Sequence, residues 1–323
     1  MILFLLKIGR RLYGKVFGLK LRTFFNRFPP ENNGQESSDL IYDILASNKP
    51  CMISRLGNVE FKCVYFYKIN KNNIFKKYIK YIKYIIGDID DVDWTPKMKH
   101  ELQHNAGFFT ATSENLEKFS QRMLKDIVNI DILASGIDYE NEFKEELKNA
   151  ATIGFEDLNS YNHKNPWSRV LKNKKVLVIH PFAESIQSQY KRREFLFENK
   201  EVLPDFELIT YKPVQSIAGN FESTGFKDWF EALSKMENDI GKIDFDIAII
   251  GCGAYGLPLA SFVKKIGKQG VHIGGAVQIL FGIIGRRWET EYDLTEHINE
   301  YWIRPSSSEI PKNFKNVEEG CYW

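Results

Sequence analysis

The chain has 323 residues, of which 43% are hydrophobic and 27% charged. This composition is that of an ordinary globular protein, long enough for one large domain or two small ones. A net charge of +2 argues against a nucleic-acid partner held by bulk electrostatics. The four cysteines are widely spaced and form no CxxC pair, which argues against a cysteine zinc site and fits a reducing cytosol.

The first 29 residues predict an amphipathic helix that lies on a membrane surface. Met1–Leu6 is apolar, but Lys7 ends the run far short of the roughly 20 residues that a membrane-spanning helix needs. Residues 1–28 contain seven basic residues and no acidic one, interleaved with apolar residues. Helices in the interface of an anionic membrane have this pattern, so we expect a cytoplasmic protein peripheral to the inner face of the cell membrane. The alternative is a basic helix packed on its own domain.

A polar linker follows the first helix, and a second basic and aromatic segment lies farther along the chain. Pro29-Pro30 ends the first helix, and the polar composition of residues 31–38 predicts the linker. Residues 74–86 place apolar and aromatic side chains at helical spacing with lysines between them. They predict an amphipathic helix whose lysines face solvent, and a second membrane contact is the alternative.

Residues 30–323 predict one α/β domain with a helix-rich half, a Rossmann-like half and a tail. In the first half, 36–166, we expect helices, one of them capped by Thr112, and a single short strand at 51–54. In the second half, 170–290, strands alternate with helices, which predicts a parallel sheet flanked by helices. The expected strands of this half are 175–180, 206–211, 246–251 and 271–273, and residues 291–323 form the tail.

Polar residues follow the first strand of the Rossmann-like half, where ligands of parallel sheets bind. His180, Glu184 and Ser185 come directly after it. His180 is a candidate acid or base because its ordinary pKa lies near neutrality, and a structural histidine is the alternative. Farther along, Arg287 precedes Trp288, and this pair would suit a nucleotide or a sugar.

The run Gly251-Cys-Gly-Ala-Tyr-Gly256 matches GxGxxG, follows a strand and opens a helix. Its glycines would let the backbone approach a diphosphate at the helix amino terminus. A nicotinamide site would also have an acidic residue at the end of the next strand. Here that strand contains His272 and ends in Gly274-Gly275, which weighs against NAD and favours a generic diphosphate cradle. A tight turn without a ligand is the alternative.

Two segments resemble the GT-D glycosyltransferases. Ile53-Ser-Arg-Leu-Gly-Asn-Val-Glu60 resembles their S-R-x-G-D-x-E segment, and residues 246–275 resemble their closing strand, glycine loop, helix and strand. In the order of elements the resemblance covers residues 40–300. It implies a GT-D-like fold and transfer of a sugar from a nucleotide-diphosphate donor, with a UDP-sugar favoured. The implied acceptor is a bacterial surface glycan, often lipid-linked.

The metal motif of that family falls on Asn58 and Glu60, with asparagine in place of aspartate. An amide oxygen can ligate Mg²⁺ or Mn²⁺ but carries no charge, so binding should weaken. Glu60 could suffice, cations such as Arg55 could replace the metal, or the chain could be a non-catalytic relative. Two other functions stay open: a membrane-associated protein that binds or assembles polysaccharide, and an NAD-dependent oxidoreductase.

The predicted site comprises a catalytic set, a ligand-binding set and a metal pair. The candidate catalytic residues are Glu60, His180 and Glu184. The candidate nucleotide-sugar-binding residues are Arg55, Gly57, Asn58, Ser185, Gly251, Gly253, Tyr255, Gly256, His272, Gly274, Gly275 and Arg287, and the metal ligands are Glu60 and Asn58.

Overall fold

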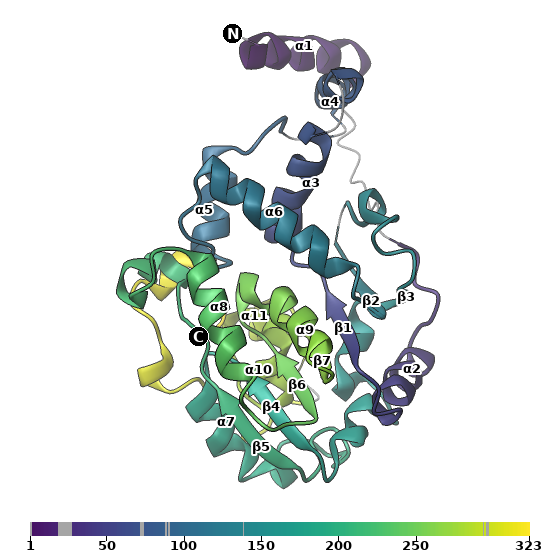
Figure 1. The fold of residues 1–323 in the computed structure, drawn as a ribbon, viewed down its shortest axis with the longest axis vertical. Coiled ribbons are helices and arrows are strands. Elements are labelled where there is room, and N and C mark those ends of the chain that lie inside the picture. Colours follow the sequence, from purple (N-terminus) through teal and green to yellow (C-terminus); the bar gives the residue numbers. More distant parts are fainter. Residues whose placement is uncertain are drawn as a thin grey trace.

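The protein is built around one seven-stranded, all-parallel sheet, which confirms the predicted Rossmann-like α/β class (Figure 1). A computed structural model describes residues 2–18, 28–71, 74–87, 89, 91–137, 139–292, 294 and 297–323. The strand order is β3-β2-β1-β7-β6-β4-β5. The strands are β1 (Cys51–Arg55), β2 (Ile132–Ser135), β3 (Ala151–Gly154), β4 (Lys175–Ile179), β5 (Glu207–Tyr211), β6 (Ile247–Ile250) and β7 (Gln269–His272).

Helices cover both faces of this sheet. One face packs against α3 (Asn58–Lys71), α5 (Pro96–His104), α6 (Ser113–Ile127), α8 (Trp229–Ile240) and α9 (Gly256–Lys265). The other packs against α2 (Gln35–Ala46), α7 (Ala183–Tyr190), α10 (Val277–Leu280), α11 (Arg286–Thr290) and the tail. The central strands are therefore buried on both faces, and their sequences, such as Ile-Ala-Ile-Ile in β6, are continuously apolar rather than alternating.

The helix-rich half contributes more to the sheet than its sequence indicates. It supplies β1 as predicted, and also β2 and β3, which fall in a region where we expected helices and loops. Each of these two strands is only four residues long. An apolar run of that length does not distinguish a strand from a buried turn of helix, so the pairing with β1 decides its conformation.

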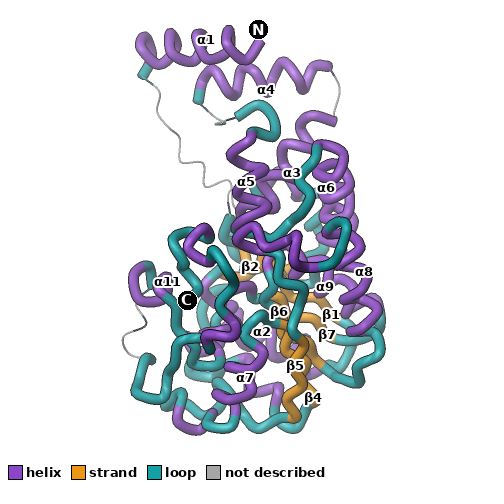
Figure 2. Tube along the Cα trace, turned by 90° about the vertical axis from the view of Figure 1, so that its left-hand side faces the viewer, coloured by secondary structure: helices purple, strands orange, loops and turns teal. Residues whose placement is uncertain are grey.

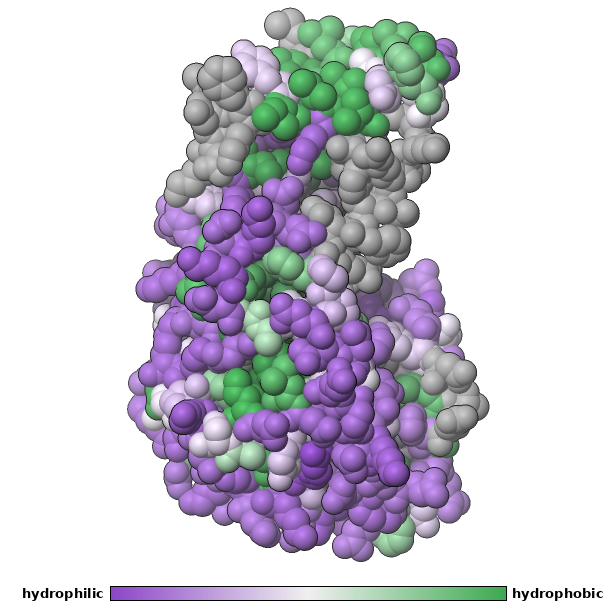
Figure 3. All heavy atoms as spheres, turned by 90° about the vertical axis from the view of Figure 1, so that its right-hand side faces the viewer, coloured by the Kyte–Doolittle hydropathy of each residue, from purple (hydrophilic) through white to green (hydrophobic). Residues whose placement is uncertain are grey.

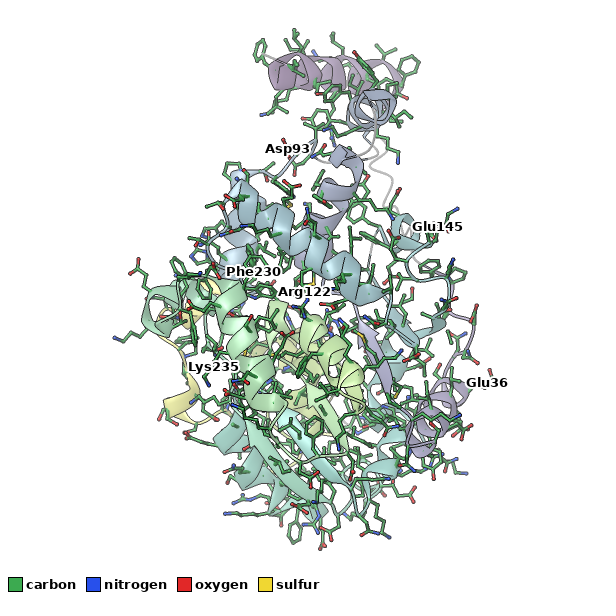
Figure 4. The ribbon with its side chains drawn as sticks, viewed as in Figure 1. Glu36, Asp93, Arg122, Glu145, Phe230 and Lys235 are labelled. Atoms are coloured by element: carbon green, nitrogen blue, oxygen red, sulfur yellow. The ribbon has the colours of Figure 1, made fainter. Side chains whose placement is uncertain are left out.

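Pairing of β1 with β7 joins the two halves of the chain. Residues 51–54 lie in register with residues 269–272, and β1 pairs with β2 on its other side. A second link connects the helices: Arg122 of α6 forms an ion pair with Asp126 of its own helix and one of 2.6 Å with Glu237 of α8. Figure 4 shows Arg122 where α6 meets the helices over the sheet. The two halves thus share one sheet.

Two helices lie apart from the sheet. α1 (Ile2–Phe17) packs on α4 (Ile74–Ile86), and both lie beyond the far end of α3 (Figures 1 and 2). Both were predicted as helices. Within the described residues, no helix combines the length and apolar character that crossing a membrane requires. The predicted basic residues Lys20, Arg22 and Arg27 lie outside the described residues.

Thr112 caps the amino terminus of α6, as predicted. The Thr112 hydroxyl accepts a hydrogen bond from the backbone N–H of Asn115 at 3.2 Å. Replacing Thr112 by alanine leaves this amide without its partner and should lower the free energy of unfolding by about 1 kcal/mol in urea titrations. Thr112→Ser keeps the hydroxyl and should stay close to wild type. Equal losses in both variants would contradict a capping role.

Candidate functional site

Neighbouring strands in the middle of the sheet send their connections to opposite faces. The chain leaves β1 and β6 toward the face covered by α3 and α9, and leaves β7 and β4 toward the face covered by α10 and α7. Such opposite departures open crevices at the carboxyl edge of a parallel sheet. Two adjacent pockets lie at this edge, one beside β1 and β7 and the other beside β6 and β4.

The first, which we name the charged pocket, gathers most of the predicted site. Its volume is about 290 Å³. Residues from β1 and the start of α3 face residues that follow β6 and β7, with Arg287 of α11 beside them. The predicted residues in its lining are Arg55, Gly57, Asn58, Glu60, Gly253, His272, Gly274, Gly275 and Arg287.

Arg55 carries the unneutralised charge of the charged pocket. Its half-buried guanidinium lies 4.8 Å from the centre of the Phe155 ring. It forms neither a hydrogen bond nor an ion pair with any residue that the structure describes, although Glu60 and Glu156 are near enough for their charges to interact with it. A side chain at Gly274 would meet the Arg55 guanidinium at 3.4 Å. Arg55 therefore offers its N–H donors beside exposed backbone, as an anion site requires.

Glu60 lies in the first turn of α3 and folds back over Gly57, where any larger residue would clash with its carboxylate. Burial raises the pKa of Glu60, while its own backbone amide and the Arg55 charge oppose that rise. Asn58 is exposed at the pocket rim. No cluster of three or more His, Cys, Asp or Glu side chains able to hold a metal occurs among the described residues. One carboxylate and one amide fit Mg²⁺ or Mn²⁺ only when phosphate oxygens complete the ligand set.

Arg287, in contrast, is already neutralised. It forms ion pairs with Glu318 and, at 3.5 Å, with Glu291. It also donates a hydrogen bond of 3.0 Å to the Tyr322 hydroxyl, and its guanidinium lies 4.9 Å from the centre of that ring. Arg287 thus holds Tyr322 in the pocket wall, and its charge is less available to a ligand than that of Arg55.

The two predicted histidines are buried and neutral. His272 shares a hydrogen bond of 3.0 Å with the Ser54 hydroxyl, and burial, aided by the Arg55 charge, lowers the pKa of His272 to about 3. His180 accepts a hydrogen bond from the Phe182 amide through Nδ1 at 3.0 Å, and burial lowers its pKa to about 3. Its proton therefore sits on Nε2. A histidine with such a pKa is a weak base at neutral pH and acts more readily as a neutral hydrogen-bond donor.

Most of the GxGxxG turn packs against protein. A side chain at Gly251 would clash with the Gly274 carbonyl, and one at Gly256 would clash with His272. Tyr255 is buried and stacks on Trp229 with ring centres 5.2 Å apart. Gly253 is the exposed glycine of the turn and borders both pockets. These glycines allow close packing of the β6 and β7 loops, whatever ligand the edge takes.

Glu184 and Ser185 are separated from this cluster and line neither pocket. The buried carboxylate of Glu309, in the tail, accepts hydrogen bonds from the Glu184 amide at 2.8 Å and from the Ser185 hydroxyl. The Glu184 carboxylate accepts one from Ser308 at 2.9 Å. An internal carboxylate thus occupies the amino terminus of α7, where a phosphate could otherwise bind.

The second pocket, which we name the apolar pocket, lies beside His180 and Gly251. Its volume is about 70 Å³, several times the roughly 10–15 Å³ that one water needs. Phe182, the loop 213–217, Gln278 and Trp323 complete most of its wall. Gln278 Oε1 and Trp323 Nε1 are buried without a hydrogen-bond partner within the part of the chain that the structure describes. Buried polar atoms are normally paired, so these two atoms are exceptions within the wall of the apolar pocket.

Several residues that line the two pockets were not predicted from the sequence, because no motif or pattern marks them. Asn105, Tyr322 and the loop 213–217 reach the site from elements far away in the chain. The pockets share Asn105, Ala106, Gly253, Gly275 and Tyr322, so they form one continuous edge. Comparison with known proteins adds no relative: no family model, curated protein or solved structure matches this chain.

The neutral histidines predict a specific dependence of stability on pH. Below pH 6.5, the ordinary value, His180 takes up a proton in the unfolded chain, whereas the folded protein resists it until about pH 3. Its contribution to stability is complete above pH 6.5 and is lost as the pH falls toward 3, at about 1.4 kcal/mol per pH unit.

His180→Asn keeps an acceptor for the Phe182 amide but cannot titrate. Between pH 6 and 4, the free energy of unfolding measured in urea should therefore change less steeply with pH in this variant. The difference in slope should correspond to about one proton. His272→Asn should reduce the slope similarly, because burial lowers the pKa of His272 as well. A slope unchanged in His180→Asn would show that this histidine is not buried in its neutral form.

Proposed function

We propose that the protein is a glycosyltransferase that moves a sugar from a nucleotide-diphosphate donor, a UDP-sugar by preference, to a bacterial surface glycan. The observation that carries the proposal is the half-buried Arg55, which has no ion-pair partner among the described residues and lies beside the backbone of Gly274. This cation is the natural place for a diphosphate. The resemblance of residues 53–60 to the GT-D segment gives independent support.

The apolar pocket would hold the base of the donor. It adjoins the charged pocket across Gly253 and Gly275, so one nucleotide could occupy both. Gln278 and Trp323 line this pocket, and each has a buried polar atom without a hydrogen-bond partner among the described residues. Apolar walls with few polar groups are typical of small-molecule sites.

In the proposed reaction, the bond between the anomeric carbon and the diphosphate oxygen breaks, and a bond to an acceptor hydroxyl forms. Arg55 would stabilise the charge that develops on the leaving diphosphate. The raised pKa of Glu60 suits it to take the acceptor proton. If a divalent cation binds instead, Glu60 and Asn58 would hold it, and the cation would neutralise phosphate charge while Glu60 serves as a ligand rather than as the base.

A second candidate is a non-catalytic protein that binds polysaccharide or its precursors. Two observations favour it: an uncharged Asn58 occupies the acidic position of the metal motif, and the Glu60 carboxylate is folded back over Gly57. Such a protein would bind the nucleotide sugar without consuming it. Binding and turnover must therefore be measured separately.

We also propose that the protein works on the cytoplasmic face of the cell membrane, where a lipid-linked acceptor would be found. The support is α1, which exposes apolar side chains such as Phe4 and Leu12 and carries basic but no acidic residues. A helix of this kind lies in the interface plane of an anionic membrane.

Removing the charge of Arg55 should weaken nucleotide binding. In isothermal titration with UDP, Arg55→Gln should lose about tenfold to a hundredfold in affinity, as expected for a hydrogen-bonded charge on a phosphate. Arg286→Gln is the matched control, because Arg286 is exposed, ion-paired with Glu319 and outside both pockets. Wild-type UDP binding in Arg55→Gln, or no binding in any form, would refute this assignment.

Glu60 distinguishes the enzyme from the binding protein. With UDP-sugar, Mg²⁺ or Mn²⁺ and water as the acceptor, the wild type should hydrolyse the donor to UDP and free sugar, and Glu60→Gln should do so at least about a hundredfold more slowly while still binding UDP. Nuclear magnetic resonance can follow sugar release in both forms. Binding without release in the wild type would support the non-catalytic alternative.

A further inference from the structure

Apolar surface is concentrated at one end of the molecule. Among the described residues, all exposed large hydrophobic side chains except Val128, Phe195 and Ile266 belong to α1 or α4. Figure 3 shows the corresponding hydrophobic atoms gathered over this end. A large exposed apolar patch of this kind marks a surface that binds another protein, a ligand or a membrane.

α1 and α4 are joined into one unit. Gly9 of α1 lies against Ile85 of α4, where an added side-chain carbon would be only 3.4 Å away. Arg10 donates hydrogen bonds to the carbonyls of Tyr84 at 3.3 Å and Ile89 at 2.7 Å, and its guanidinium lies 4.8 Å from the centre of the Tyr84 ring. Arg10 thus fixes one helix to the other, and the remaining basic residues of α1 face outward.

Part of the exposed surface of α1 forms two adjacent stripes. At helical spacing, one stripe is apolar and the other is basic, and the exposed Phe4 lies on the basic side. The exposed apolar stripe contains Leu5, Ile8, Leu12 and Val16, and the exposed basic stripe contains Lys7, Arg11 and Lys15. α4 adds Tyr78, Ile79 and Ile82, each more than half exposed.

Charge selects the partner of this surface. Neither helix contains an acidic residue, and both contain several basic ones. A second copy of the chain would bring two surfaces of the same charge together, which is unfavourable. An anionic bilayer offers both an apolar phase for the side chains and negative headgroups for the lysines and arginine.

α3 sets the position of the ligand edge relative to this surface. It begins at Asn58, on the rim of the charged pocket, and ends at Lys71, three residues before α4 begins. Fourteen helical residues span about 20 Å, so the pocket lies about that far from the α1–α4 unit. The opposite edge of the sheet, at Lys49 before β1, lies farther away.

We propose that α1 and α4 act together as a two-helix surface that docks the protein on an anionic bilayer with the carboxyl edge of the sheet turned toward the membrane. This extends the membrane location proposed above by assigning α4 as a second contact and by fixing the orientation. It does not depend on the nucleotide chemistry, because the contacts that define it lie outside both pockets.

Vesicle flotation tests the contribution of α4. The full chain should bind vesicles of equal parts phosphatidylcholine and phosphatidylglycerol, and bind phosphatidylcholine alone much more weakly. Ile79→Glu with Ile82→Glu on α4 should reduce binding about tenfold or more, as should Ile8→Glu with Leu12→Glu on α1. Phe195→Glu with Ile266→Glu is the matched control, since these exposed apolar residues lie elsewhere, and it should bind like wild type.

Circular dichroism and UDP titration on the same variants show whether the domain is intact, so loss of docking can be told apart from failure of the nucleotide site. Wild-type flotation of the α4 variant would overturn the two-helix surface and leave α1 as the sole contact. Equal binding to both vesicle types would overturn the role of charge. A lipid-free dimer in sedimentation that the α1 or α4 variants dissociate would identify the surface as a contact between copies.

Energy transfer tests the orientation. The four native cysteines are buried, so a single introduced cysteine can carry a fluorescent label. Transfer to an acceptor dye on the lipid headgroups should be stronger from Asn58→Cys than from Lys49→Cys, because these positions lie beyond opposite ends of β1. Equal transfer, or stronger transfer from Lys49→Cys, would overturn the proposed orientation.

Discussion

The pairing of β1 with β7 is the constraint on which the rest of the molecule depends. These strands are separated by more than half of the chain, yet residues 51–54 and 269–272 lie side by side in one parallel ladder. Their register places Ser54 opposite His272, so the segments that follow both strands meet at the same edge. This pairing brings Arg55, at the end of β1, against the backbone of Gly274, just after β7. Without it, the helix-rich half and the Rossmann-like half would carry separate parts of an incomplete pocket.

Most of the basic side chains at the edge that this pairing creates are either paired with an acidic residue or neutral. Arg287 is held by Glu318 and Glu291, and His180 and His272 are neutral because burial lowers their pKa values. Arg55 remains as a cation whose N–H groups have no hydrogen-bond partner among the described residues. A guanidinium without a hydrogen-bond or ion-pair partner beside exposed backbone can bind a negatively charged ligand through its own N–H groups, even though the charges of Glu60 and Glu156 lie near it.

The helix that begins at the charged pocket ends close to the two helices that we propose as the membrane surface. α3 begins with the Asn58–Glu60 turn and leads directly to α4, on which α1 packs. The geometry places an anion pocket about 20 Å from an apolar and basic surface, at the end of a single stiff element. The fold therefore joins the two proposed properties in one short segment.

The sequence alone determined the α/β class, the long apolar strands such as β6, the Thr112 cap and the helical character of α1 and α4, because periodicity, capping and continuous apolar runs are local properties. It did not reveal β2 and β3, whose four residues each become strands only by pairing with neighbours. Tertiary structure also decided which site residues meet: Arg55 and Glu60 reach Gly253, while Ser185 is taken by Glu309, over a hundred positions away. Contacts between distant segments depend on strand register and packing, which no local pattern encodes.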